Sequence, residues 1–155
     1  MAIRIIRTTD DPVLREKAKD VPEITPQVQR LLADMVETMY DAEGIGLAAP
    51  QIGISKRIIV IDVQDETGVL KLINPEIISR EGKETAIEGC LSFPGVAGEV
   101  DRDESVTVRA QDAEGNTVEI CASGLLARAF QHEIDHLDGV LFVDKVTRLL
   151  EQNES

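Results

Sequence analysis

Three residues toward the C-terminal end of the chain combine the types and the spacing that a catalytic metal site requires. His132 and His136 are four positions apart, so a helix over residues 131–139 would project both imidazoles from one face. Two imidazoles at this separation can bind one divalent metal ion, and Glu133 beside them can carry protons for a metal-bound water. These are also the only two histidines in the sequence. The pattern therefore predicts a metal centre suited to hydrolysis.

Two histidines do not complete such a centre, because a catalytic site needs about three protein ligands and one open position for water. A cysteine, an aspartate or a glutamate could supply the third ligand. Cys90 follows a glycine and lies shortly before Pro94, a turn-like setting that can expose a thiol to a cleft. A metal would hold that thiol as thiolate. Cys121 lies in an alternating stretch, and we expect it to be a small core residue.

Length and composition predict one folded domain over residues 1–155, with a short polar tail at 146–155. No apolar run is long enough to cross a membrane, and residues 1–7 lack the features of a secretory signal. We therefore expect a cytoplasmic protein, in which two cysteines do not indicate a disulfide framework. The net charge of −13 argues against a broad electrostatic grip on nucleic acid or an anionic membrane.

Hydrophobic periodicity predicts two main helices that would carry or support the metal site. The first covers residues 26–43, begins at a threonine–proline pair and has Gly44 as a plausible C-terminal cap. The second covers residues 125–137 and ends at Gly139. A shorter helix is expected to start at Asp11, which precedes a proline.

Several strands are predicted between the helices from β-branched or alternating residues. They cover residues 57–63, 69–73, 76–79, 105–110 and 117–121. The last two flank a turn and should form a hairpin. The order of helix, strands and helix indicates an α+β fold, with mixed, largely antiparallel sheets packed around the C-terminal metal-binding helix.

Residues 44–51 are rich in small side chains. They contain a G-x-G-x-x-A pattern, which binds dinucleotides where it follows a strand and opens a helix. Here the pattern follows a helix and precedes a strand, so we reject a nucleotide site. We interpret the stretch as a place where another backbone can approach closely, with Gln51 as a lone polar side chain at its end.

Three stretches taken together resemble the signature motifs of peptide deformylase, a bacterial and organellar family. They cover residues 44–51, 88–92 and 131–139, and they match the family in order and spacing. The resemblance extends over nearly the whole chain. It implies a metallo-hydrolase that acts on a linear amide C–N bond other than a peptide bond. The expected reaction removes the N-formyl group from N-formylmethionine of nascent polypeptides and releases formate.

The same resemblance implies the metal ligands, which would be Cys90, His132 and His136. They would hold one divalent ion per chain. Fe²⁺ is expected, and Zn²⁺, Ni²⁺ or Co²⁺ could replace it. One thiolate and two imidazoles suit both iron and zinc.

The resemblance also assigns roles around the metal. Glu133 would take a proton from the attacking water and pass it to the leaving amine. The Gln51 side-chain amide and the Leu91 backbone N–H would stabilise negative charge on the formyl oxygen. The substrate would lie down as an added strand. The implied substrate-binding residues are Ile45, Gly46, Gly89, Leu125 and Ala129.

Two departures from the family bear on partners. Many bacterial members carry a basic residue shortly after the second motif, whereas residues 95–101 here have none before Arg102. Some members end in a long basic helix that docks on the ribosome, and this chain ends in a short acidic stub, a poor RNA ligand. We expect N-formylated nascent peptides as partners, weak or absent ribosome docking through the tail, no direct nucleic-acid or membrane binding, and a monomer.

Two alternatives remain open. In the first, the cysteine and the histidines form a structural metal site, although such sites usually take four protein ligands and no fourth cysteine or histidine is well placed. In the second, the protein is another metal hydrolase, such as a peptidase or an amidase that acts on a free formylated metabolite. Peptidases with this helix commonly take their third ligand from a downstream histidine or glutamate, and Cys90 lies upstream.

Overall fold

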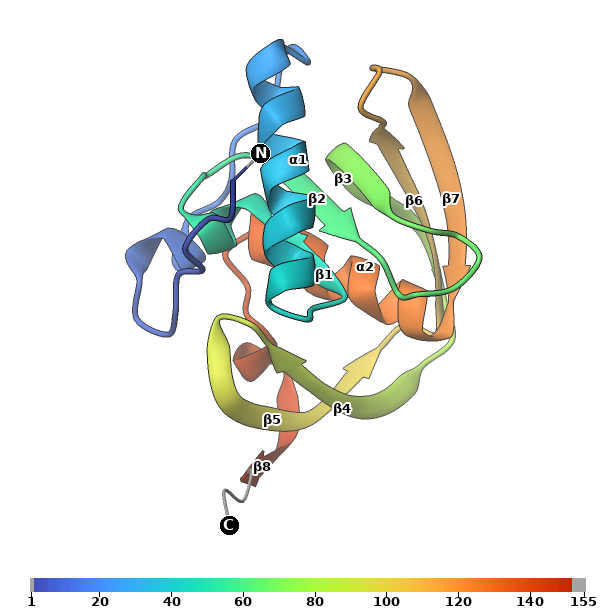
Figure 1. The fold of residues 1–155 in the computed structure, drawn as a ribbon. Coiled ribbons are helices and arrows are strands. Elements are labelled where there is room, and N and C mark those ends of the chain that lie inside the picture. Colours follow the sequence, from blue (N-terminus) through green and yellow to red (C-terminus); the bar gives the residue numbers. More distant parts are fainter. Residues whose placement is uncertain (1, 152–155) are drawn as a thin grey trace.

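The computed structural model describes residues 2–151 of the chain (Figure 1). Its α-helices are α1 (Pro26–Asp41) and α2 (Gly124–Leu137). Its strands are β1 (Gly46–Ala48), β2 (Ile58–Ile61), β3 (Leu70–Glu81), β4 (Glu84–Cys90), β5 (Phe93–Arg102), β6 (Ser105–Gln111), β7 (Thr117–Ser123) and β8 (Val146–Glu151). Three short 3-10 helices are η1 (Pro12–Arg15), η2 (Ala49–Ile52) and η3 (Phe142–Asp144).

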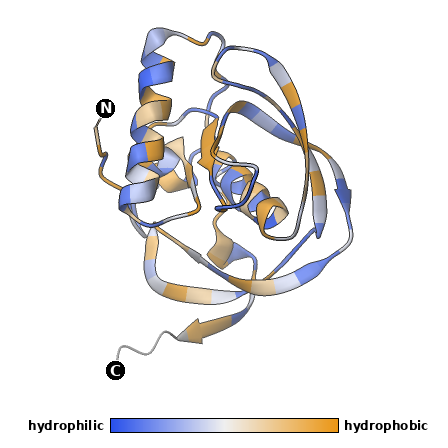
Figure 2. Ribbon diagram, turned by 45° about the vertical axis from the view of Figure 1, so that its right-hand side comes forward, coloured by the Kyte–Doolittle hydropathy of each residue, from blue (hydrophilic) through white to orange (hydrophobic). Residues whose placement is uncertain are grey.

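Helix α1 begins where the sequence predicts. The Thr25 side chain accepts a hydrogen bond from the Val28 backbone N–H at 3.2 Å, which satisfies one of the free donors of the first turn. The C-terminal end differs from expectation, because Glu43 and not Gly44 adopts the left-handed conformation, with φ of 59°. The helix carries polar and apolar residues on different sides (Figure 2), and its apolar side packs in one core cluster with residues of β1 and β2.

The larger sheet has five strands in the order β1-β2-β3-β6-β7, and every neighbouring pair is antiparallel. The predicted hairpin is confirmed as β6 and β7. The two strands predicted around Asn74 are instead the single strand β3. Asn74 has φ of 53°, and its side chain hydrogen-bonds the N–H and the carbonyl of Val21, so it forms an irregularity within the strand and not a turn.

The smaller sheet has the order β4-β5-β8 and is also antiparallel. None of its three strands is among those predicted from the sequence patterns. Residues 146–151, expected as part of a polar tail, form β8, and the remainder of that expected tail lies outside the described residues. Gly98 of β5 makes room for β8, since a Cβ there would lie 2.7 Å from a methyl carbon of Val146.

Helix α2 runs between the two sheets (Figure 1). Its apolar residues pack in one core cluster with β2, β3, β6 and β7. Because α2 is covered on nearly all sides, its polar residues Arg128, Gln131, His132, Glu133 and His136 are buried as well. The predicted α+β class, with antiparallel sheets around the histidine-bearing helix, is confirmed.

The prediction that Cys121 belongs to the core is wrong. Successive side chains of a strand point to opposite faces. In β7 Ala122 is buried, and Cys121 is exposed on the other face beside Thr107 of β6. The alternating pattern identified the strand correctly but placed this residue on the wrong face.

Candidate active site

The thiol and both imidazoles expected as metal ligands converge in the structure. Helix α2 carries His132 and His136, and strand β4 ends at Cys90. One donor atom from each residue lies within 4.8 Å of the other two. The Cys90 Sγ is 3.3 Å from the His136 Nε2. Both histidines are buried and Cys90 is partly exposed, so the group lies below the surface.

Glu88 fixes the orientation of His132, and sequence reasoning missed this residue. Its Oε1 lies 3.0 Å from the His132 Nδ1, which leaves the Nε2 free to face Cys90. Arg102 donates to both oxygens of Glu88, at 2.8 and 2.9 Å. Burial opposes ionisation of Glu88, but the hydrogen bonds from Arg102 and His132 outweigh it and hold the pKa of Glu88 well below its usual range. Its position two residues before Cys90, on the same face of a strand, could have revealed it.

The charged neighbours act differently on the two histidines of the metal-free protein. Burial lowers the pKa of His132, but Glu133, Cys90 and Glu88 together raise it to about 10. Burial, followed by the nearby charge of His132, places the pKa of His136 well below its usual value. The surroundings therefore favour a proton on His132 and disfavour one on His136.

Glu133 lies beside the ligands in a dry environment. Burial raises the pKa of Glu133 to about 7. Among residues 2–151, no hydrogen-bond donor reaches its Oε1, which leaves that oxygen free to accept a proton or a hydrogen bond. Its Oε2 would lie only 2.6 Å from a Cβ at position 46. The carboxylate of Glu133 thus occupies the space that a side chain at position 46 would need, and only glycine fits there.

Gln51 is held rigidly in η2, with its amide directed at the metal ligands. Its Oε1 accepts a hydrogen bond from the Ala48 N–H at 2.9 Å. Its Nε2 then donates to the Ser92 Oγ at 3.2 Å and to the Cys90 Sγ at 3.5 Å. Ser92 is fully buried and was also missed, although it belongs to the same motif as Cys90.

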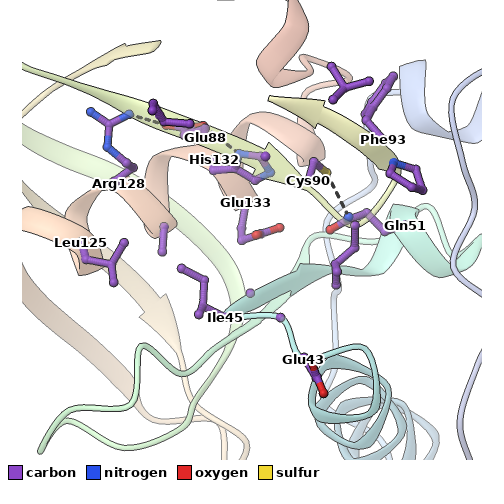
Figure 3. A pocket seen from close by; sticks show the side chains of 18 of the residues that line it. Glu43, Ile45, Gln51, Glu88, Cys90, Phe93, Leu125, Arg128, His132 and Glu133 are labelled. Carbon is purple, nitrogen blue, oxygen red and sulfur yellow. Dashed lines mark hydrogen bonds and ion pairs between the residues drawn. The ribbon is translucent and has the colours of Figure 1, made fainter. Parts of the chain in front are cut away.

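A cavity of about 390 Å³ joins these groups. Ile45 and Leu125 lie toward one end, and Cys90 and Gln51 lie toward the other, with Glu133 between the two ends (Figure 3). The sequence-predicted residues that line this cavity are Ile45, Gly46, Gln51, Gly89, Cys90, Leu91, Leu125, Ala129, His132 and Glu133. The remaining predicted ligand, His136, is buried next to Cys90. The fold thus brings every predicted site residue to one place.

Comparisons with known proteins agree with this arrangement. The sequence profile described as polypeptide deformylase matches residues 3–152. The peptide deformylase of Halothermothrix orenii is 58% identical over 152 residues, which covers 98% of this chain and 99% of that protein. The chain belongs to the polypeptide deformylase family.

Solved deformylase structures have the same fold. The enzyme from Legionella pneumophila superposes with a TM-score of 0.91 at 50% identity, covering 94% of this chain and 87% of that one. The enzyme from Synechococcus elongatus, described in complex with actinonin, superposes with a TM-score of 0.88 at 47% identity, covering 97% and 80%.

This deformylase is a metal-dependent hydrolase that removes the N-formyl group from N-formylmethionine of nascent polypeptides. The family expected from the three sequence motifs is thus confirmed. None of the helices within residues 2–151 has the length and apolar character needed to span a bilayer.

Proposed function

We propose that Cys90, His132 and His136 bind one Fe²⁺ per chain, which Zn²⁺, Ni²⁺ or Co²⁺ can replace. The convergence of one thiol and two imidazoles, with His132 oriented by Glu88, is the observation that carries this assignment. The donor set fits either iron or zinc chemically. When bound, the metal supplies a Lewis acid that acidifies water and polarises the formyl group.

The chain's own residues then move the proton and receive the charge. Glu133 takes the proton from the attacking water and delivers it to the leaving amine, and its Oε1, which no described residue satisfies, supports both transfers from beside the ligands. The Gln51 amide and the Leu91 backbone N–H stabilise the negative charge that develops on the formyl oxygen. The hydrogen bonds to Ala48 and Ser92 hold the Gln51 side chain in place beside Cys90, and the N–H that lies 3.5 Å from the Cys90 Sγ is the one that turns to the formyl oxygen.

The cavity supports a defined placement of the substrate. The methionine side chain occupies the apolar end beside Ile45, Leu125 and Ala129, and the formyl group lies near Cys90 and Gln51. The β1 and β4 edges, represented by Gly46 and Gly89, both line the cavity. The nascent peptide adds to these edges as an extra strand.

The test of this function is formate release from formyl-Met-Ala-Ser, measured with iron-loaded protein purified without oxygen. Acetyl-Met-Ala-Ser is the matched control, because limited space near the metal excludes the extra methyl group. We also expect actinonin to inhibit the reaction competitively. Equal turnover of the two peptides would contradict the proposed placement of the formyl group.

Replacing Gln51 by alanine should reduce kcat by about 10² to 10³-fold, the usual cost of removing one oxyanion donor. Metal content should remain at one ion per chain, because the amide is not a ligand. Gln29→Ala, which removes an exposed amide bonded to the Ala113 carbonyl, is the control and should retain full activity. An unchanged kcat in the Gln51 variant would remove this residue from the mechanism.

Without metal, the protein should lose stability as the pH rises from about 7 to about 10. The raised pKa of His132 means that the folded state keeps a proton which the unfolded state, with a pKa of 6.5, has released. Stability therefore falls by up to about 1.4 kcal/mol per pH unit in this window. The midpoint of thermal unfolding, measured across the window, should decrease less in His132→Gln. A midpoint that rises with pH in both proteins would contradict the expected direction.

We further propose that residues 1–155 form one catalytic domain, which acts in the cytoplasm as a monomer close to ribosomes. Weak docking through the C-terminal end follows from its acidic composition. Deleting residues 152–155, and thereby sparing β8, should not change cosedimentation with ribosomes. A loss of cosedimentation on this deletion would show that the tail is a docking element.

A further inference from the structure

Arg128 is a buried arginine on α2 that lies one helical turn before His132. Its Nη1 is 2.6 Å from the Glu88 Oε2, and the same nitrogen donates to the Val100 carbonyl at 3.0 Å. Its Nη2 donates to the Glu84 carbonyl at 2.8 Å. One guanidinium therefore connects α2 to the first residue of β4, to Glu88 near the end of β4, and to β5.

The position of this guanidinium matters because β4 has a strand partner on one side only. Among the described strands, β4 pairs with β5 and leaves its other edge at the cavity. The same strand carries Glu88 and Cys90. Arg128 lines the cavity beside Glu88 (Figure 3). Its contacts thus hold both the cavity-facing edge and the carboxylate that orients His132.

The second arginine on Glu88, Arg102, shares the ion pair with this carboxylate but not the contacts of Arg128 with the strand backbone. Arg102 divides its charge between Glu88 and Asp135, with an Nη1–Oδ2 distance of 2.6 Å to Asp135. The Arg102 guanidinium donates to Glu88 and Asp135, whereas the Glu84 and Val100 carbonyls accept hydrogen bonds from the Arg128 guanidinium. A planar guanidinium can serve several acceptors at once, whereas an ammonium acts as a point charge.

We propose that Arg128 is a positioning residue that locks β4 against α2. Through its ion pair with Glu88 it keeps that carboxylate directed at His132, and through the two carbonyls it fixes the edge on which the peptide lies. This inference rests on the proposed ligand set and peptide site, so wild-type protein must first bind one metal ion per chain and release formate from formyl-Met-Ala-Ser.

Two substitutions of Arg128 distinguish the effect of its ion pair with Glu88 from the effect of its hydrogen bonds to the two carbonyls. Arg128→Met keeps the apolar stem and removes every donor, and it should lose metal to a competing chelator about 10 to 100-fold more readily, with KM raised about 10-fold. Arg128→Lys keeps a cation beside Glu88 but cannot reach both carbonyls, so metal retention should return while KM stays raised. The readouts are Zn²⁺ retention, KM and kcat on the same peptide, and the unfolding midpoint.

Arg109→Met is the matched control, because Arg109 forms an exposed pair with Glu119 on the far sheet and should change none of the readouts. If Arg128→Lys restored KM as well as metal retention, the proposed role of the hydrogen bonds to the two carbonyls would be wrong. If Arg128→Lys retained metal no better than Arg128→Met, the proposed role of the ion pair with Glu88 would be wrong. A methionine variant that is less stable but unchanged in metal retention and KM would reduce Arg128 to a structural residue. If the wild type bound metal but released no formate, the proposed function would fail instead.

Discussion

Replacing Glu133 by alanine should lower the rate of formate release by about 10² to 10⁴-fold while the metal content stays at one ion per chain. Glu133 is not a ligand, so its loss leaves Cys90 and the two histidines in place. It is the carboxylate with a raised pKa that lies in the cavity next to those ligands, and nothing described in the structure satisfies its Oε1. Removing a positioned general base usually costs about 10² to 10⁴-fold in rate.

The measurement compares wild type, Glu133→Ala and Glu133→Gln at equal metal loading on formyl-Met-Ala-Ser. The glutamine variant preserves shape, so its failure would locate the effect in proton transfer and not in packing. Glu119→Ala, which removes an exposed carboxylate, serves as the control. If the alanine variant kept its rate as well as its metal, Glu133 would have no part in proton transfer. If no protein released formate while metal stayed bound, a structural metal site would be the better explanation.

Replacing Cys90 by alanine should remove the metal itself and therefore all activity. The thiol is the only proposed ligand from the smaller sheet, and the other two donors come from α2. Losing groups that merely orient a ligand weakens metal binding by about 10 to 100-fold, so losing a ligand should cost more. Metal content after dialysis and formate release are the two readouts.

The chain supplies a matched control for this experiment. Cys121→Ala also removes a thiol, but that thiol lies on an exposed strand face outside the cavity. This variant should keep one metal ion per chain and full activity. Full metal occupancy in Cys90→Ala would mean that another donor completes the site and that the proposed ligand set is wrong.

The sequence predicts the elements and motifs that depend on local pattern. The start of α1 follows from a threonine–proline pair, and the histidine spacing places both imidazoles on one face of α2. Strand β5 escapes such reasoning, because Pro94, Gly95 and Gly98 lower its strand propensity. Gly98 is there to admit β8, a contact visible only in three dimensions.

The polar interior of the site is equally hidden from sequence pattern. Arginine and glutamate are rarely buried unless paired, so Arg102, Arg128 and Glu88 look like surface residues when each is taken alone. They are buried because they neutralise one another across α2, β4 and β5. The face assignment of Cys121 fails for a related reason, since alternation does not say which side of a strand meets the core.

The two open strand edges at the cavity carry a risk for this protein. An unpaired edge is a template for aggregation, and most proteins cover or shorten such edges. In the proposed mode of peptide binding these edges cannot be covered permanently, so protection must come from other features. Strand β1 has only three residues, and β4 begins with the exposed Glu84. A nascent chain bound to both edges would block their pairing with a second copy of the enzyme for as long as it stayed bound. The same two strands would then affect both solubility and catalysis.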